Sequence, residues 1–375
     1  MMSEWNHSTI NDVCVLVTDG SHSSPKSVHD GEYMVSVKDF TDYGFDFSSC
    51  RMISHDDYEV LKRNGCVPQI DDILIGKDGA RFFEDIIIYR QREKPALLSS
   101  IAILRCDKSK ILPDFLYYAL RTPSFKQDVK DNYGSGSAIP RIILKDFKRM
   151  MVSYPSLEKQ RSIISVLTAI DSKIQANTEI NDNLQQQAQA IYSSMFIDNP
   201  DPAWSHGHLS DLITVKYGKD HKKLADGIYP VYGSGGIMRY VERPLYNKES
   251  VLIPRKGTLN NVMYVNQPFW SVDTMFYTEM KLPNVAKFVY HFVKAKDLAS
   301  MNAGSAVPSM TTDILNAMEV VIPSASALEE FESLVAPMYE AMEANDVQSK
   351  ALSQMRDTLL PKLMSGKIDV SSVQL

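Results

Sequence analysis

Two loops of the sequence carry residue types that bind phosphate. In each half of the chain a glycine lies beside Lys or Arg, just after an apolar run that predicts a strand. The residues are Lys77, Gly79 and Arg81 in the first half and Arg255, Lys256 and Gly257 in the second. A glycine lets backbone N–H groups approach a phosphate, and Lys and Arg neutralise its charge. The pattern favours contact with nucleic acid; the alternative is a pair of tight turns with solvated charges.

A further glycine-rich loop, residues 132–137, could approach nucleic acid for the same reason, and an Arg follows it. Its counterpart around residues 302–305 has no following Arg. The remaining candidates for DNA contact, from this loop and from the second half, are Ser135, Ser137, Arg141, Arg239 and Asn260.

Metal-dependent chemistry has little support in the sequence. Asp71 and Asp72, with Lys77, resemble a nuclease metal site, but the matching stretch before Arg255 in the second half has no acidic pair. His206 and His208 lack further ligands nearby. We therefore predict no metal site in this chain.

No motif for nucleotide chemistry is present either. The sequence has no G-x-x-x-x-G-K-[ST] phosphate loop. The glycine-rich segment 233–236 follows no clear strand and opens no helix, which argues against a dinucleotide-binding loop. We predict no catalytic residues.

The two phosphate-binding patterns belong to a larger repeat. A Gly-Ser-x-x-Pro loop, a Pro-Ser pair and an Asn within a helical pattern occur twice, at a constant offset of 168 positions. The landmarks are Gly136, Pro155 and Asn177 in the first half and Gly304, Pro323 and Asn345 in the second. An ordered repeat of this kind indicates a duplicated module of domain plus helix.

Each globular half is predicted to be a mixed α+β domain. Short β-like runs at residues 85–89, 101–104 and 262–265 are separated by turn residues, and helical patterns follow at 113–120 and 286–293. A chain of 375 residues is longer than one core usually serves. We predict a first domain over 1–154, a long helix over 155–197, a second domain over 198–322, and a second long helix with a tail over 323–375.

Both long helices carry a seam with 3–4 spacing, which is typical of a coiled coil. The first seam is Ile163, Leu167, Ile170, Ile174, Asn177, Asn181, Leu184, Ala188, Ile191 and Met195. The second is Phe331, Leu334, Met338, Ala341, Asn345, Gln348, Leu352, Met355 and Leu359. Ser156 is the expected N-cap of the first helix, with Glu158 or Gln160 reaching back toward it.

Asn177 and Asn345 hold equivalent seam positions, and a lone Asn there usually sets register. The simplest arrangement is an antiparallel helix pair with a pseudo-two-fold axis and the two asparagines near one level. The alternative is that each helix packs only on its own domain or on a second chain.

Composition limits the class of protein. The net charge of −6 argues against non-specific coating of nucleic acid, although local basic patches remain compatible with it. The four cysteines form no C-x-x-C pair, so neither a disulfide framework nor a duplicated zinc site is expected. No segment resembles a signal peptide or a membrane span. We predict a cytoplasmic protein.

The order of these features resembles one known family, the DNA-specificity subunit of type I restriction-modification enzymes. The resemblance rests on the duplicated domain and helix, the Gly-Ser-x-x-Pro loops, the proline-led helix start at residues 155–160, and the final segment 359–368. Residues 204–209 and 216–218 are also similar to the family's usual domain start. The resemblance covers essentially the whole chain.

The resemblance implies a non-catalytic reader of a bipartite DNA site, with one target-recognition domain for each half. The helices would act as a spacer and dock two methyltransferase subunits, and a restriction subunit would join them. No cofactor is then expected in this chain, whereas S-adenosylmethionine, ATP and Mg are expected on partner subunits. A structural adaptor with two protein-binding domains is the main alternative, and a self-contained enzyme is a weaker one.

Overall fold

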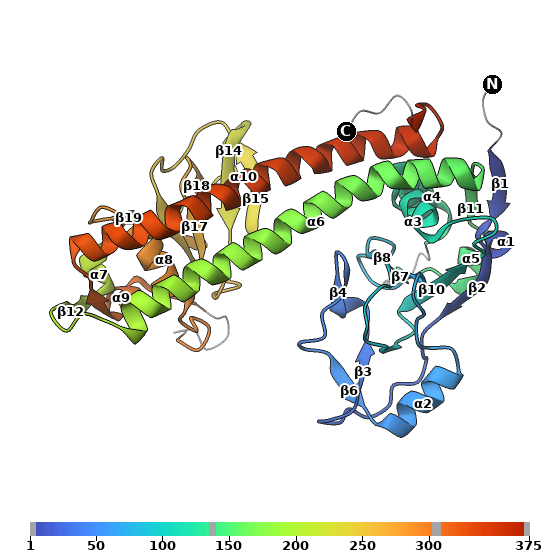
Figure 1. Cartoon of the computed structure of the whole chain (residues 1–375), viewed down its shortest axis with the longest axis horizontal. Coiled ribbons are helices and arrows are strands. Elements are labelled where there is room, and N and C mark those ends of the chain that lie inside the picture. The colour runs from blue at the N-terminus through green and yellow to red at the C-terminus, as the bar shows by residue number, and fades with distance from the viewer. Residues whose placement is uncertain (1–4, 135–139, 302–308, 371–375) are drawn as a thin grey trace. The chain divides into compact units, whose positions relative to one another are not determined.

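The computed structural model describes residues 5–134, 140–301 and 309–370. The chain divides into two compact units, which we call unit 1 (residues 1–175 and 348–375) and unit 2 (residues 176–347). Two long helices, α6 (Leu157–Ser193) and α10 (Ala325–Met364), contribute residues to both units (Figure 1). No helix in the described ranges combines the length and apolar character that crossing a membrane requires.

Unit 1 is built from short strands with helices between them. The strands are β1 (Asn6–Thr9), β2 (Cys14–Asp19), β3 (Glu32–Val35), β4 (Phe40–Thr41), β5 (Gly44–Phe45), β6 (Arg51–Ile53), β7 (Ile73–Gly76), β8 (Ile86–Ile88), β9 (Ala96–Leu97), β10 (Ile101–Cys106) and β11 (Met151–Tyr154). The short helices are α1 (Ile10–Val13), η1 (Val37–Asp39), α2 (His55–Arg63), α3 (Pro113–Arg121), α4 (Pro123–Asn132) and α5 (Leu144–Arg149).

Unit 2 has the same mixed character. Its strands are β12 (Ser205–His208), β13 (Ile213–Tyr217), β14 (Asp226–Gly233), β15 (Gly236–Val241), β16 (Ser250–Pro254), β17 (Met263–Val265), β18 (Trp270–Ser271), β19 (Met275–Met280) and β20 (Glu319–Ile322). Its shorter helices are η2 (Ser194–Asp198), α7 (Leu209–Leu212), α8 (Ala286–Lys294) and α9 (Thr312–Asn316).

The two units share one strand topology. A four-stranded antiparallel sheet has the order β2-β10-β7-β8 in unit 1 and β13-β19-β16-β17 in unit 2. A three-stranded sheet, with one antiparallel and one parallel pair, has the order β6-β3-β9 in the first and β15-β14-β18 in the second. The predicted duplication of a mixed α and β domain is confirmed.

A glycine directly after the first strand of each four-stranded sheet lets the chain approach a neighbouring segment closely. A Cβ at Gly20 would collide with the Leu97 carbonyl oxygen, and one at Gly218 would collide with that of Val272. The peptide N–H of each glycine donates to the opposite strand, Gly20 to Ile101 and Gly218 to Met275. The chain therefore crosses from one sheet to the next at a distance that only glycine permits.

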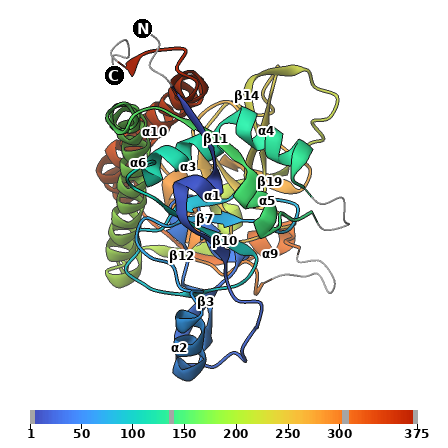
Figure 2. The same ribbon diagram turned by 90° about the vertical axis from the view of Figure 1, so that its right-hand side faces the viewer.

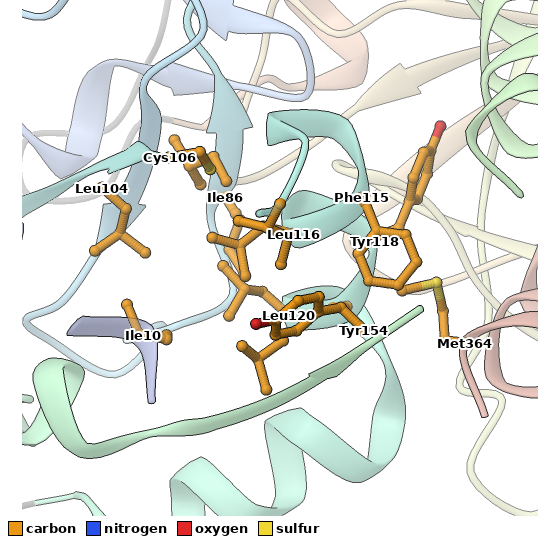
Figure 3. Close-up of a cluster of buried hydrophobic side chains, with 14 of the residues drawn as sticks. Ile10, Ile86, Leu104, Cys106, Phe115, Leu116, Tyr118, Leu120, Tyr154 and Met364 are labelled. Carbon is orange, nitrogen blue, oxygen red and sulfur yellow. The ribbon is translucent and has the colours of Figure 1, made fainter. Parts of the chain in front are cut away.

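The main core of unit 1 lies between the four-stranded sheet, α3 and the end of α10. Apolar residues fill β7 completely, and all four are buried. Figure 3 shows Phe115 and Tyr118 of α3 in this core, with Met364 of α10 beside their rings. Figures 1 and 2 both place α2 at the other end of unit 1, away from α10.

The main core of unit 2 is an aromatic cluster between α8 and the two long helices. Tyr192 and Phe196 from the end of the first long helix and its extension contact Phe288 of α8 and Phe331 of α10, with ring centroids 4.9–6.2 Å apart. Aromatic pairs in tilted or edge-on geometry stabilise such a core beyond the area that they bury.

The long helices pack on each other in each unit, as predicted. In unit 2, Asn177 Nδ2 donates to the Asn345 carbonyl oxygen at 3.3 Å. Asn345 Nδ2 donates to Asn181 Oδ1 at 2.8 Å, and Asn181 Nδ2 donates to Asp346 Oδ1 at 2.8 Å. In this antiparallel pairing, the asparagines predicted to set register lie at one level.

The predicted seam of the second helix is wrong in part. Phe331 is buried, but Leu334 and Met355 are exposed at 46% and 43%. The buried stripe instead runs through Leu328, Phe331, Val335, Tyr339, Leu360 and Leu363. Apolar residues lie at neighbouring positions along this helix, so that spacing alone fits two stripes, and contacts with α8 and the sheets select one of them.

Candidate nucleic-acid interface

The first glycine loop (residues 77–81) follows β7 and forms backbone hydrogen bonds with residues 140–142. Gly79 has a φ of 93°, and a Cβ there would meet open space. The Gly79 N–H donates to the Pro140 carbonyl oxygen at 3.0 Å, and the Ile142 N–H donates to that of Lys77 at 3.0 Å. This pairing brings Arg141 to the loop, with Nε 3.7 Å from Asp78 Oδ1.

The charges of the first glycine loop are neutralised within unit 1. Lys77 is 1% exposed, and its Nζ lies 3.3 Å from Asp19 Oδ2. Arg81 is exposed but pairs with Asp85 at 2.6 Å. The Lys77 side chain therefore faces the interior, where its contact with Asp19 stabilises the loop and no phosphate reaches it.

The second glycine loop (residues 255–257) repeats the backbone geometry with open charges. Gly257 has a φ of 85°, and the Met310 N–H donates to the Arg255 carbonyl oxygen at 2.9 Å. Lys256 is exposed, and Arg255 lies over the Tyr217 ring, 5.3 Å from its centroid. Neither Arg255 nor Lys256 forms an ion pair with a carboxylate of residues 5–134, 140–301 or 309–370. This loop can therefore offer its cations to phosphate.

Two other residues of the second half that were predicted to contact DNA, Arg239 and Asn260, form hydrogen bonds within the protein. Arg239 Nη2 donates to Asp226 Oδ1 at 2.8 Å and to the Leu224 carbonyl oxygen at 2.9 Å. Asn260 Nδ2 donates to Asp297 Oδ1 at 3.0 Å, and its Oδ1 accepts from the Ala299 N–H. Ser135 and Ser137 lie outside the described residues.

Asp71 and Asp72, which were considered as metal ligands, form ion pairs with Lys and Arg side chains. Asp72 is fully buried, and both its carboxylate oxygens accept from the Arg105 guanidinium at 2.8 Å. Asp71 accepts from Lys108 at 2.7 Å and from Arg90. No group of three or more acids, histidines or cysteines suited to a metal occurs among the described residues.

The glycine-rich segment 233–236 follows a strand, contrary to the prediction. It joins β14 to β15 as a hairpin turn. Because it leads into a second strand and opens no helix, it lacks the helix N-terminus that a dinucleotide-binding loop uses.

Polar side chains that sequence patterns did not reveal tie unit 1 to the long helices. Gln160 of α6 is fully buried, and its Nε2 donates to the carbonyl oxygens of Lys110 at 2.9 Å and Pro155 at 3.0 Å. Its Oε1 accepts from the Leu112 N–H at 2.9 Å. The sequence suggested only that Gln160 or Glu158 reaches back toward the Ser156 cap; the Gln160 amide instead holds Pro155 and the start of α3.

A second anchor of unit 1 joins three helices. Tyr118 of α3 donates to Asp171 Oδ2 of α6 at 2.8 Å, and Arg356 Nη1 of α10 donates to Asp171 Oδ1 at 3.0 Å. Asp171 lies 168 positions before Tyr339 of unit 2, which fills the same role there. In the sequence, only the offset of 168 positions relates Asp171 to Tyr339.

The anchor of unit 2 centres on a fully buried histidine. His291 of α8 lies 2.8 Å from Gln189 Oε1 of α6 through Nδ1 and 3.0 Å from the Tyr339 hydroxyl of α10 through Nε2. Burial lowers the pKa of His291 to about 4. The folded unit therefore holds this ring neutral.

We expect the stability of unit 2 to fall as the pH is lowered from 6.5 to about 4. Because the folded pKa of His291 is depressed, the unfolded chain binds the proton first, and the free energy of unfolding falls by up to about 1.4 kcal/mol per pH unit in that window. Peptide-resolved hydrogen exchange of the full chain at several pH values measures this fall in the free energy of unfolding of unit 2. In H291Q this contribution should be absent; an unchanged pH dependence in that variant would contradict the assignment.

Known proteins share this architecture. Residues 2–186 and 203–331 match the family model described as the type I restriction modification DNA specificity domain. The type I restriction enzyme MjaIX specificity subunit of Methanocaldococcus jannaschii is 24% identical over 310 residues, which cover 71% of each chain. The HindI specificity subunit of Haemophilus influenzae is 21% identical over 373 residues, covering 69% of this chain and 78% of that one. The crystal structure of an S subunit from M. genitalium covers 96% of each chain at 18% identity, with a TM-score of 0.60, and so has the same fold.

Proposed function

The chain belongs to the family of type I restriction-modification DNA-specificity subunits, and from that premise we propose that each of its two units reads one half of a bipartite DNA site. The main support for this proposal is the strand topology with its glycine loop, which occurs in both units. Each unit places a positive-φ glycine loop after the equivalent inner strand of its four-stranded sheet, β7 or β16, while the residues around the two loops differ. Phosphate contacts can be common to two readers, whereas base contacts must differ between them.

The second glycine loop is the stronger phosphate site of the two. Its Lys256 is exposed and Arg255 is held on Tyr217, whereas the first loop has Lys77 inside the protein. In unit 1 the proposal therefore relies on Arg81 and Arg141, because the Gly79 N–H is already bonded to Pro140. The ion pairs of the two arginines with acids are partly exposed and therefore weak.

The long helices are proposed to dock two methyltransferase subunits. Single exposed apolar side chains on both helices are compatible with this role. They are Ile180, Leu334, Val347 and Met355. The docked subunits would bind S-adenosylmethionine and methylate adenine, and a restriction subunit using ATP and Mg would complete the nuclease. We propose that this assembly works in the cytoplasm.

Single-molecule sequencing of adenine methylation in host DNA, with and without this gene, tests the proposed function. We expect methylation at one bipartite motif to disappear when the gene is deleted and to return with the gene on a plasmid. Unchanged methylation, while a neighbouring methyltransferase gene is expressed, would instead favour the structural adaptor.

A further inference from the structure

In unit 2 the tip of the β14–β15 hairpin contacts the second glycine loop and the residues that follow it. Asn261 Nδ2 donates to the Ser234 carbonyl oxygen at 2.8 Å. A Cβ on Gly257 would lie 2.6 Å from Ser234 Oγ, so the absence of a side chain there lets the tip approach. The hairpin tip and the cations at residues 255 and 256 therefore form one surface.

In unit 1, too, the segment that joins two strands of the three-stranded sheet lies beside the glycine loop, but this segment is longer than the hairpin turn of unit 2. The strands equivalent to β14 and β15 are β3 and β6, and the residues that join them, 36–50, include η1, β4 and β5. A surface pocket of about 450 Å³ lies between this connection and the first glycine loop. Its lining residues include Val37, Lys38, Phe40, Gly76, Gly79 and Arg81. The variable connection thus lies beside the shared loop in both units.

A β-bulge at the hairpin exposes two neighbouring apolar side chains. Tyr232 pairs with Ile237, but the preceding residue, Val231, pairs with Arg239, so Met238 is an extra residue in β15. Neighbouring side chains of a regular strand point to opposite faces, and a bulge re-aims one of them. Ile237 and Met238 are accordingly both open to solvent, at 49% and 61% exposure.

These features suit the reading of base edges in duplex DNA. Apolar side chains contact the methyl group of thymine in the major groove, which a two-stranded ribbon can enter. A hairpin that carries two such side chains, and whose tip approaches Gly257 of the second glycine loop, can read bases while the loop holds a phosphate. The hairpin tip is held by the hydrogen bond from Asn261 to the Ser234 carbonyl oxygen, and Gly257 leaves room for it.

We propose that the β14–β15 hairpin reads the second half-site, with Ile237 and Met238 in apolar contact with thymine methyl groups. By the same placement, residues 36–50 read the first half-site. This inference rests on the proposed function and adds to it the segment that reads bases.

The test uses the complex of the full chain with its methyltransferase subunits and a randomised duplex library sequenced for methyladenine. In I237A and M238A we expect discrimination at one or two base pairs of one half-site to fall about tenfold. The other half-site and the spacer should stay as in the wild type. Because both side chains are exposed, these substitutions should leave the fold intact, which melting of the complex verifies.

Two matched variants locate the contact. Ile228 is 78% exposed on β14, at the end of the hairpin remote from the tip, and I228A should keep every specificity. K256A should weaken binding to all sequences alike and reduce the salt dependence of binding by about one phosphate contact.

Two results would overturn the hairpin assignment, and a third would overturn the proposed function. Unchanged specificity in both I237A and M238A would overturn the hairpin assignment and leave the proposed function standing. Relaxed specificity in I228A at the same base pairs would also overturn it, since the tip would not be the reader. A wild-type complex that methylates no bipartite motif would overturn the proposed function itself.

Discussion

Replacing Lys77 by Met should lower the free energy of unfolding of unit 1 by about 3 kcal/mol. Lys77 and Asp19 form a buried ion pair, and removal of the ammonium leaves a buried carboxylate without its main partner. His22 Nε2 also lies 3.3 Å from Asp19, which limits the loss to the lower end of the range for broken buried pairs. Peptide-resolved hydrogen exchange should show faster opening in unit 1 and unchanged rates in unit 2.

Two controls separate the interior role of Lys77 from a role in DNA contact. The double variant D19N/K77M removes the charges of Lys77 and Asp19. Asp78, which lies 3.7 Å from Lys77, keeps its contact with Arg141, so the double variant should recover much of the lost stability. R81A removes an exposed ion pair and should change stability by less than about 0.5 kcal/mol. A K77M protein of wild-type stability that no longer binds DNA would contradict the interior assignment.

The sequence predicted the architecture because the repeat constrains it. The landmarks at an offset of 168, such as Asn177 and Asn345, predicted two modules and an antiparallel helix pair; the structure and the family match confirm both modules and the DNA-specificity function. The glycine loops were also found correctly as features of the backbone, since Gly79 and Gly257 both have positive φ.

The side chains around those loops could not be predicted in the same way. Lys77 follows an apolar strand and looks like a surface cation, but its partner Asp19 comes from β2, which does not pair directly with β7. The position of a charge depends on such non-local partners, and local spacing carries no information on them. The same is true of Arg239, whose ion pair with Asp226 spans the β14–β15 hairpin.

The buried polar anchors were missed for a related reason. Gln160 and His291 lie within helical patterns in which a polar residue usually faces solvent. Each is buried because a neighbouring element supplies its hydrogen-bond partners, which are the Lys110 and Leu112 backbone for Gln160 and the Tyr339 hydroxyl for His291. Asp171 and Tyr339 were missed as well, because the repeat places different residue types at these equivalent positions.

Lengthening both long helices by four residues should lengthen the DNA spacer by about two base pairs and leave both half-sites unchanged. Four residues add about one turn and ~6 Å of helix, and duplex DNA rises 3.4 Å per base pair. The insertions belong after Gln175 and before Gln348, because there they interrupt neither the Asn177–Asn345 contact of unit 2 nor the Asp171–Arg356 contact of unit 1. Methylation mapping of the complex reads the spacer directly.

The design separates the length of the helices from the length of the chain. A four-residue insertion between Pro200 and Asp201, in the exposed connection after η2, lengthens the chain without lengthening either helix, and should leave the spacer as it was. An insertion in one helix alone leaves a turn without a partner across the seam, so that this variant should lose stability as well as activity. Altered half-sites with an unaltered spacer in the double insertion would show that the helices do not set the spacing, and the role of Asn177 and Asn345 would then be confined to the register of the pair.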